Sequence, residues 1–131
     1  MPVLKLGNSS LVRNSVQRGA SMADARIVLT TVGVAEKAEQ LANLLVERRL
    51  AACVNIVGPI RSIYRWKGSI EREQEYLLVI KTTAERAAEL EAAFAEHHPY
   101  ELQERVELSI EGGSAPYLEW LSAQVARDEP Q

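Results

Sequence analysis

The sequence predicts an α+β domain with the element order β-α-β-β-α-β and one added helix at its C-terminal end. Three observations predict this class. Short β-branched or alternating apolar runs mark strands, two stretches between them carry apolar residues at helical spacing, and a Lys-Gly-Ser turn at 67–69 joins two long strand-like segments. Because crossover connections are right-handed, this order folds into a ferredoxin-like sandwich, an antiparallel sheet with two helices on one face.

The first half of the domain begins with residues 27–31, a β-branched run typical of a buried strand. Apolar residues then recur at helical spacing and predict a helix; they are Val34, Ala38, Leu41, Ala42 and Leu45. Residues 50–66 are strand-like and bend at Gly58-Pro59. Residues 70–81 return antiparallel to them and end in a continuous apolar run, which is typical of a central strand.

The second half of the domain is marked by helix boundary signals. Residues 82–85, Thr-Thr-Ala-Glu, have the form of a capping box and predict a helix start. Residues 97–99, His-His-Pro, end that helix because proline disfavours helical geometry in the residue before it. Residues 106–110 alternate as in a half-buried strand. Ser114 is a candidate cap for the last helix, which has Pro116 in its first turn.

The chain of 131 residues favours a single domain, predicted over residues 23–131. Residues 1–22 mix Gly, Ser, Asn and Arg without a sustained period, and we interpret them as a leader or flexible extension. The alternative is a short ordered arm that packs on a neighbouring molecule.

Charge and cysteine usage favour a cytoplasmic protein that binds neither nucleic acid nor membranes. Residues 26–131 contain 12 basic and 17 acidic residues, which argues against a phosphate-tracking surface. No apolar run approaches the ~18 residues that a membrane span needs. The single cysteine, Cys53, cannot form an internal disulfide, so a reducing compartment is expected.

The two long middle segments form a hairpin that is predicted to project beyond the domain, since strands average about 5–6 residues. The projecting part carries apolar side chains that a small domain cannot cover: Ile60, Ile63, Tyr64, Trp66 and Ile70. Exposed apolar strands recruit other chains, so self-assembly is expected. The same region holds Arg61, Arg65, Lys67, Arg72 and Lys81. Because Glu71, Glu73 and Glu75 are interleaved with them, a solvated face of mixed charge is favoured over a basic patch.

Several separated segments resemble the CutA family of divalent-cation tolerance proteins. They are Ala51-Ala52-Cys53-Val54-Asn55, Ser62-Ile63-Tyr64-Arg65-Trp66-Lys67-Gly68, residues 77–82, His98-Pro99-Tyr100-Glu101 and Tyr117-Leu118-x-Trp120-Leu121. The similarity covers about residues 26–124. It implies a ferredoxin-like fold, a homotrimer similar to the PII signalling proteins with hairpins paired between subunits, and a role in tolerance to copper and other divalent cations. Gln103 stands where the family commonly has proline, and residues 1–22 have no counterpart.

The candidate metal ligands are Cys53, His98 and Glu101, which together suit Cu(II) or another divalent cation. We expect any such site to be assembled between subunits, and no cofactor to be required, because the chain lacks the paired-cysteine spacing of structural zinc sites. Cys53 has an alternative role as a small buried hydrophobe. His98 has an alternative role at the helix end, bonded to a backbone carbonyl.

A second candidate set is Tyr64, Trp66, Lys81 and Tyr100, with Glu101 beside them. Aromatic rings next to a lysine can line a cleft between subunits for a small anion or nucleotide. The alternative is packing in the trimer, with Trp66 as an interface anchor.

The sequence offers little for catalysis, because it has no glycine-rich phosphate loop, no nucleophile elbow and no carboxylate pair spaced for acid/base work. The function predicted is therefore a non-enzymatic, trimeric divalent-cation tolerance protein that binds copper or similar ions weakly and responds to them. The alternative is a PII-like small-molecule sensor or a protein-interaction scaffold.

Overall fold

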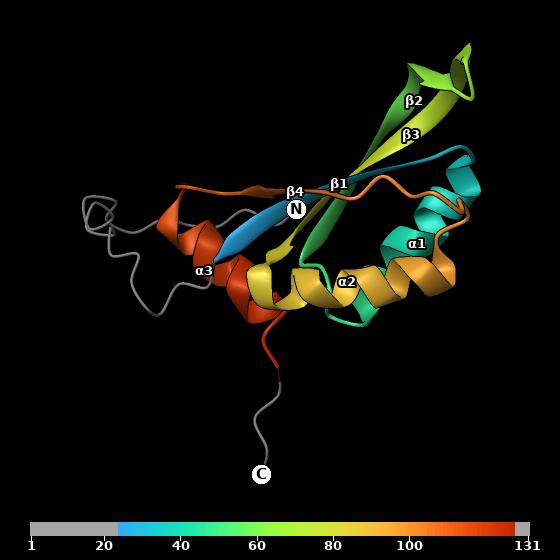
Figure 1. Ribbon diagram of the computed structural model, residues 1–131. Coiled ribbons are helices and arrows are strands. Elements are labelled where there is room, and N and C mark those ends of the chain that lie inside the picture. The colour runs from blue at the N-terminus through green and yellow to red at the C-terminus, as the bar shows by residue number, and fades with distance from the viewer. Residues whose placement is uncertain (1–23, 128–131) are drawn as a thin grey trace.

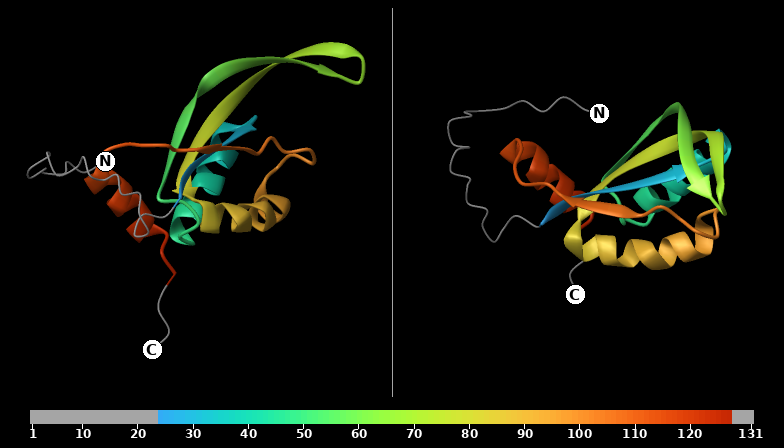
Figure 2. Two further views of the ribbon diagram at one scale, coloured as in Figure 1. Left: turned by 60° about the vertical axis from the view of Figure 1, so that its left-hand side comes forward. Right: turned by 45° about the horizontal axis from the view of Figure 1, so that its top comes forward.

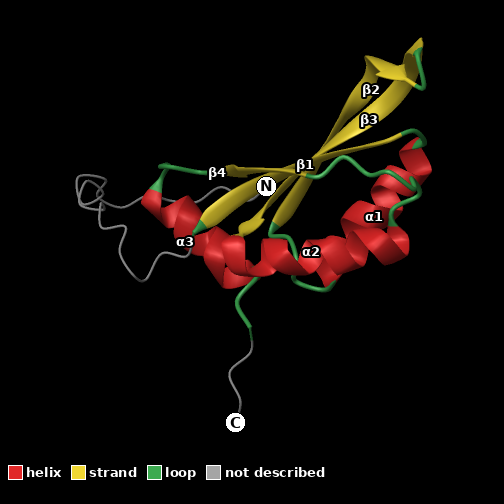
Figure 3. Ribbon diagram, in the orientation of Figure 1, coloured by secondary structure: helices red, strands yellow, loops and turns green. Residues whose placement is uncertain are grey.

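The predicted element order is confirmed. The computed structural model describes residues 24–127. Its elements are β1 (Ala25–Val32), α1 (Ala35–Glu47), β2 (Cys53–Trp66), β3 (Ser69–Thr83), α2 (Ala84–His97), β4 (Val106–Ser109) and α3 (Ala115–Gln124) (Figures 1 and 3). The leader predicted over residues 1–22 lies outside the described residues.

The four strands form one antiparallel sheet in the order β2-β3-β1-β4, and α1 and α2 cover one of its faces (Figure 1). The core lies between that face and the helices. Its fully buried side chains include Val28, Leu78, Ile80, Leu45, Leu90 and Phe94. Burying such side chains contributes about 1.5–3 kcal/mol each, which makes this the main stabilising layer of the chain.

The opposite face of the sheet is apolar and largely uncovered in the single chain. Leu29 on β1 pairs with Val79 on β3 and with Val106 on β4, so the three side chains share this face. The exposed fractions show how open this face is: Val106, with the further residues Val57 and Leu108, is 45–46% exposed. We name this surface the open face. A contiguous apolar surface of this kind marks an interaction site in soluble proteins.

The hairpin of β2 and β3 projects from the body of the domain, as predicted (Figure 2). A bulge between Val57 and Ile60 interrupts the ladder where the hairpin leaves the sheet. The projecting part exposes large apolar side chains, among them Ile63, which is 59% exposed, and Trp66, which carries the Lys67 ammonium over its ring. No helix among residues 24–127 is long and apolar enough to cross a membrane.

The hairpin separates its charges by face, and this corrects the prediction of a mixed surface. The register pairs Arg61 with Gln74, Ile63 with Arg72 and Arg65 with Ile70 on one face. It pairs Ile60 with Glu75, Ser62 with Glu73 and Tyr64 with Glu71 on the other. Because side chains alternate along a strand, the consecutive residues Glu71, Arg72 and Glu73 point to opposite sides. We name these surfaces the basic face and the acidic face.

The helix start predicted at residues 82–85 is confirmed, since α2 begins at Ala84, but the side-chain bonds of the predicted capping box are not formed. β3 continues to Thr83, which precedes α2 without a side-chain cap. The hydroxyl of Thr82 instead donates to the carbonyl of Leu50 at 2.7 Å, inside the sheet end. Ser114 does cap α3, since its hydroxyl oxygen accepts from the amide of Tyr117 at 3.5 Å.

Candidate functional site

A glycine after β1 lets a tyrosine from the α2–β4 connection reach across the sheet. Gly33 follows Val32, whose partner on β3 is Tyr76. A Cβ on Gly33 would lie 2.8 Å from Oη of Tyr100, closer than real Cβ contacts allow. With that space free, the Tyr100 hydroxyl donates to Oε2 of Glu75 at 2.7 Å. Tyr100 and Glu75 thus form a polar contact at the base of the projecting hairpin, and Gly33 leaves the space for it.

Burial makes this contact strong. Glu75 is only 6% exposed, which is unusual for a carboxylate and is tolerated when a partner is bonded to it. Burial raises the pKa of the Tyr100 phenol, and the hydrogen bond to Glu75 and the charges of Glu75 and Glu73 raise it further. Tyr100 therefore remains a neutral donor at pH values below 10.

His98 anchors the same connection from the helix-covered side of the sheet. It follows the last residue of α2, and its ring packs on Phe94 and Tyr100, with centroids 5.3 Å away in both cases. The amide of Tyr100 donates to Nδ1 of His98 at 3.1 Å, and Nε2 lies 3.0 Å from Oγ1 of Thr30. His98 is therefore bonded to the Tyr100 amide and to the Thr30 hydroxyl, and a hydrogen bond with the Thr31 backbone also acts on its ring.

These contacts assign the tautomer of His98. A backbone amide can only donate, so Nδ1 must be unprotonated and the ring proton must sit on Nε2, which donates to Thr30. Burial lowers the pKa of His98, while the Thr31 backbone and the Glu75 charge act in the opposite direction. A second proton on Nδ1 would face the Tyr100 amide and break that hydrogen bond.

Acid is therefore expected to destabilise the folded chain through His98. A histidine whose folded pKa lies below its unfolded value contributes stability that is present above pH 6.5 and is lost as the pH falls through the folded pKa. The histidine ring resonances followed by NMR in the presence of a chelator should give a midpoint for His98 below 6.5. His97, one residue earlier, is the internal comparison. A His98 midpoint at or above 6.5 would contradict this assignment.

Cys53 lies on the open face. Its partner in the register is Lys81, which also pairs with Ile27. The thiol is half-buried and its hydrogen-bonding neighbour is Oδ1 of Asn55, at 3.8 Å. Burial raises the pKa of Tyr117 on α3, and the charge of Cys53 raises it further. The Tyr117 phenol therefore lies near the Cys53 thiol. The thiol is thus neither fully buried nor firmly bonded.

The three predicted metal ligands are not brought together in one chain. His98 is hydrogen-bonded to Thr30, which pairs with Leu78 on β3. Cys53 pairs with Lys81, which lies three residues further along the same strand. An odd separation along a strand means opposite faces, so His98 and Cys53 lie on opposite sides of the sheet. Glu101 is exposed in the connection. Within residues 24–127, no group of three or more His, Cys, Asp or Glu residues is placed to hold a metal ion. A metal site shared between chains stays a prediction.

The predicted cleft residues are brought together only in part. Tyr64 lies on the acidic face; desolvation and then the charges of Glu73, Glu75 and Glu71 raise its pKa. The Tyr64 charge in turn helps to raise the pKa of Tyr100, so these two phenols share one region. Trp66 lies at the hairpin tip. Lys81 is six residues from Glu75 along β3, roughly 20 Å at about 3.3 Å per residue.

Sequence reasoning missed three residues of this site: Gly33, Thr30 and Glu75. Glu75 was grouped with the exposed hairpin acids, and nothing in its surroundings marks it as buried. Thr30 belongs to a run that predicts a buried strand, where a hydroxyl requires a partner, and this was a usable signal. Gly33 carries no local signal of its role, because admitting Tyr100 depends on a contact 67 residues away in the chain.

Known proteins with similar sequences point to one family. Residues 26–124 match the family described as CutA1 divalent ion tolerance protein. The Divalent-cation tolerance protein CutA of Thermus thermophilus is 47% identical over 95 residues, which cover 72% of this chain and 92% of that protein. The CutA homolog of Xenopus laevis is 48% identical over 84 residues, which cover 64% of this chain and 56% of that protein. The chain thus spans little more than half of that vertebrate relative.

Solved structures agree with these matches. The divalent cation tolerance protein structure from Thermus thermophilus superposes with a TM-score of 0.76 at 44% identity, covering 78% of this chain and 99% of that one. CutA1 from Oryza sativa superposes with a TM-score of 0.80 at 35% identity, covering 83% of this chain and 100% of that one.

Proposed function

Because the chain belongs to the CutA1 divalent ion tolerance family, we propose that it acts as a homotrimeric divalent-cation tolerance protein that binds copper or similar ions weakly. The family is one of non-enzymatic tolerance proteins. The observation that carries the proposed assembly is the apolar open face, which continues toward a hairpin with exposed Ile63 and Trp66. Sister chains that cover both surfaces would remove this apolar area from water.

The proposed metal site takes donors from different subunits. Cys53 supplies a thiol that bonds only loosely to Asn55, and Glu101 supplies a carboxylate that makes no ion pair within residues 24–127. Thiolate, imidazole and carboxylate are all ligands that copper accepts. Both ring nitrogens of His98 are already bonded, so coordination requires one of those bonds to open. This cost supports weak binding.

Calorimetric titration of Cu(II) into the trimer tests the metal proposal. We expect saturable binding whose affinity falls by about tenfold or more, equivalent to about 1.4 kcal/mol, in Cys53→Ala and in His98→Ala. His97→Ala is the matched control, because it removes the neighbouring imidazole, and it should bind as the unchanged chain does. Equal affinity in Cys53→Ala, His98→Ala and the unchanged chain would exclude both residues from the site.

The alternative of a PII-like sensor with a ligand cleft has less support. Tyr64 and Tyr100 share a region, but Lys81 lies at the far end of β3 and Trp66 at the hairpin tip. A cleft containing all four must therefore combine residues from two chains. We propose the cytoplasm as the compartment, supported by the single half-buried thiol of Cys53.

A further inference from the structure

The last helix, α3, packs beside the main core and not within it. Its buried residue Leu121 forms a small apolar cluster with Val125 and Ala52, separate from the core between the sheet and the other two helices. Tyr117 and Trp120 pack against this cluster from the same helix. Figure 2 shows α3 at one end of the sheet, close to the start of α2. Segments with few buried apolar contacts open at a lower free energy than global unfolding, so α3 is a candidate mobile element.

Two arginines from the body of the domain bind the C-terminal end of α3. Arg49, which follows α1, donates from Nη1 to the carbonyl of Gln124 at 3.1 Å. Arg86 on α2 donates from Nε to the carbonyl of Val125 at 2.8 Å. The last carbonyls of a helix have no partner within the helix and carry partial negative charge, so guanidinium groups suit them. The two arginines therefore fasten one end of α3 to the body of the domain.

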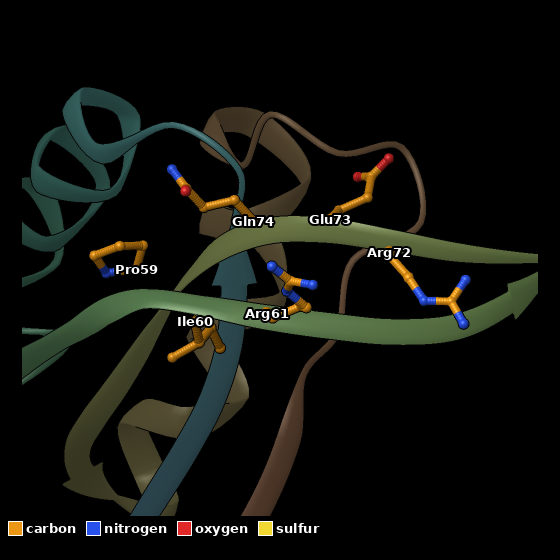
Figure 4. Close-up of a pocket in the computed structure, with 6 residues that line it drawn as sticks. All are labelled: Pro59, Ile60, Arg61, Arg72, Glu73 and Gln74. Atoms are coloured by element: carbon orange, nitrogen blue, oxygen red, sulfur yellow. The ribbon is translucent and has the colours of Figure 1, made fainter.

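The arginines of the hairpin are arranged differently. A hollow of about 380 Å³ at the base of the hairpin is lined in part by Arg61 and Arg72, whose guanidinium groups point apart (Figure 4). The hairpin is also a surface that sister chains are proposed to cover. Arg49 and Arg86, in contrast, converge on the carbonyls of two consecutive residues of α3 and its cap.

Arg49 is held in a backbone conformation that arginine rarely adopts. Its φ is 59°, in the left-handed region that favours glycine, at the place where glycine commonly ends a helix. Its amide donates to the carbonyl of Val46 at 3.1 Å, and the amide of Leu50 donates to the carbonyl of Leu45 at 2.9 Å. The bond from Arg49 to α3 gives a reason for a side chain at a position where glycine would relieve strain, because strained positions often serve a function.

The other end of α3 is joined to β4 by a connection that contains Gly112 and Gly113. β4 ends at Ser109, and the amide of Ile110 still bonds to the carbonyl of Ala25 at 3.1 Å. A Cβ on Gly112 would meet no atom of residues 24–127 within 4 Å, so there is room for the backbone to move. Glycine also adopts more backbone conformations than any other residue. This connection can therefore serve as a hinge for α3.

The helix α3 lies beside Cys53. Ala52, which packs against Leu121 and Val125, directly precedes Cys53 in the chain. The charge of Cys53 acts on the pKa of Tyr117, and the Tyr117 hydroxyl is buried without a hydrogen-bond partner among residues 24–127. The Cys53 thiol is itself only half-buried. A docked α3 therefore shields part of this thiol, and an undocked α3 would expose it.

We propose that α3 is a hinged lid beside Cys53, that Arg49 and Arg86 hold this lid shut, and that its opening admits metal ions to the thiol. The lid rests on the proposed metal response only for the identity of the incoming ion, and its opening can be measured without metal. A sister chain is the alternative cover, because Cys53 lies on the open face. Opening of a lid occurs within one chain and does not depend on protein concentration, whereas exposure by dissociation of subunits does.

Alkylation of Cys53 by iodoacetamide, followed by mass spectrometry of the full chain with a chelator present, tests the lid. The chain has one cysteine, so the mass gain reports this thiol. We expect Arg49→Gly to react about threefold faster than the unchanged chain. Its urea midpoint should stay equal or rise, because glycine relieves the strained φ. Arg86→Met should react about tenfold faster, since this arginine is buried and makes the shorter bond. Arg48→Gly makes the same substitution at the neighbouring exposed arginine and is the matched control, which should react as the unchanged chain does.

Three results would overturn the proposal. The first is an alkylation rate for Arg49→Gly no faster than that for Arg48→Gly. The second is faster alkylation of Arg49→Gly together with a lower urea midpoint, which would mean a general loosening of the fold. The third is a rate in the unchanged chain that rises on dilution, which would make a sister chain the cover of Cys53. Faster alkylation of Arg49→Gly in a chain that binds no Cu(II) would reject the proposed metal response and leave the lid intact.

Discussion

Replacing Tyr100 with phenylalanine is expected to lower the free energy of unfolding by about 1.5–3 kcal/mol, the contribution of a hydrogen bond to a charged group. The hydroxyl that would be lost donates to Glu75 at 2.7 Å, and Glu75 is buried. Without that donor the carboxylate stays out of water with no partner among residues 24–127. Urea unfolding at one fixed protein concentration measures the loss, because assembly makes stability depend on concentration.

A double-mutant cycle gives the sharper form of this experiment. Glu75→Leu alone leaves the Tyr100 hydroxyl without an acceptor, whereas Tyr100→Phe/Glu75→Leu removes both partners and is expected to be much less destabilised than the sum of the single changes. Simple additivity of the two single effects would mean that the residues do not interact. Folding raises the pKa of Tyr100. The stability that its hydroxyl contributes is therefore present below pH 10 and is lost as the pH rises toward the pKa of Tyr100 in the folded chain.

Val79→Asp is expected to prevent assembly. Val79 lies between Leu29 and Asn55 on the open face, at the centre of the surface that sister chains are proposed to cover. A carboxylate there stays hydrated in a single chain but would lose water without a partner in the assembly, and an unpaired buried charge is strongly unfavourable. Native mass spectrometry should show a single chain, with a circular dichroism spectrum that confirms the retained fold.

Val34→Asp is the matched control for Val79→Asp. Val34 is a 54% exposed valine at the cap of α1 and has no side-chain cap bond. Aspartate at this position can accept a helix amide, so the variant should fold at least as well and assemble as the unchanged chain does. Intact assembly in Val79→Asp would place the subunit contacts elsewhere, and loss of assembly in both variants would point to a general effect of added charge.

The fold was largely predictable because its signals are local. Alternation at residues 106–110, the turn at 67–69 and helical spacing before Leu45 each depend on neighbouring residues, and together they allow one right-handed topology. The length of the hairpin and its apolar side chains indicated a projecting surface, and both are seen. The capping box does not form because Thr82 still belongs to β3, where its hydroxyl donates a hydrogen bond to the Leu50 carbonyl.

The candidate site was much less predictable because it depends on register and on distant contacts. The sequence Glu71-Arg72-Glu73 shows mixed charge, and only the pairing with β2 shows that the charges fall on opposite faces. Tyr100 and His98 were singled out by sequence, but their partners Glu75 and Thr30 are 25 and 68 residues away. Such pairs become visible only when the sheet order is known.

The mass of the unchanged protein in solution tests the central claim most directly, namely that copies of the chain cover the open face and the projecting hairpin. Sedimentation equilibrium at micromolar concentration should give three times the 14.5 kDa chain mass. The tryptophan fluorescence of the same sample should report Trp66 as shielded from water. A stable 14.5 kDa species with a fully hydrated Trp66 would contradict the claim.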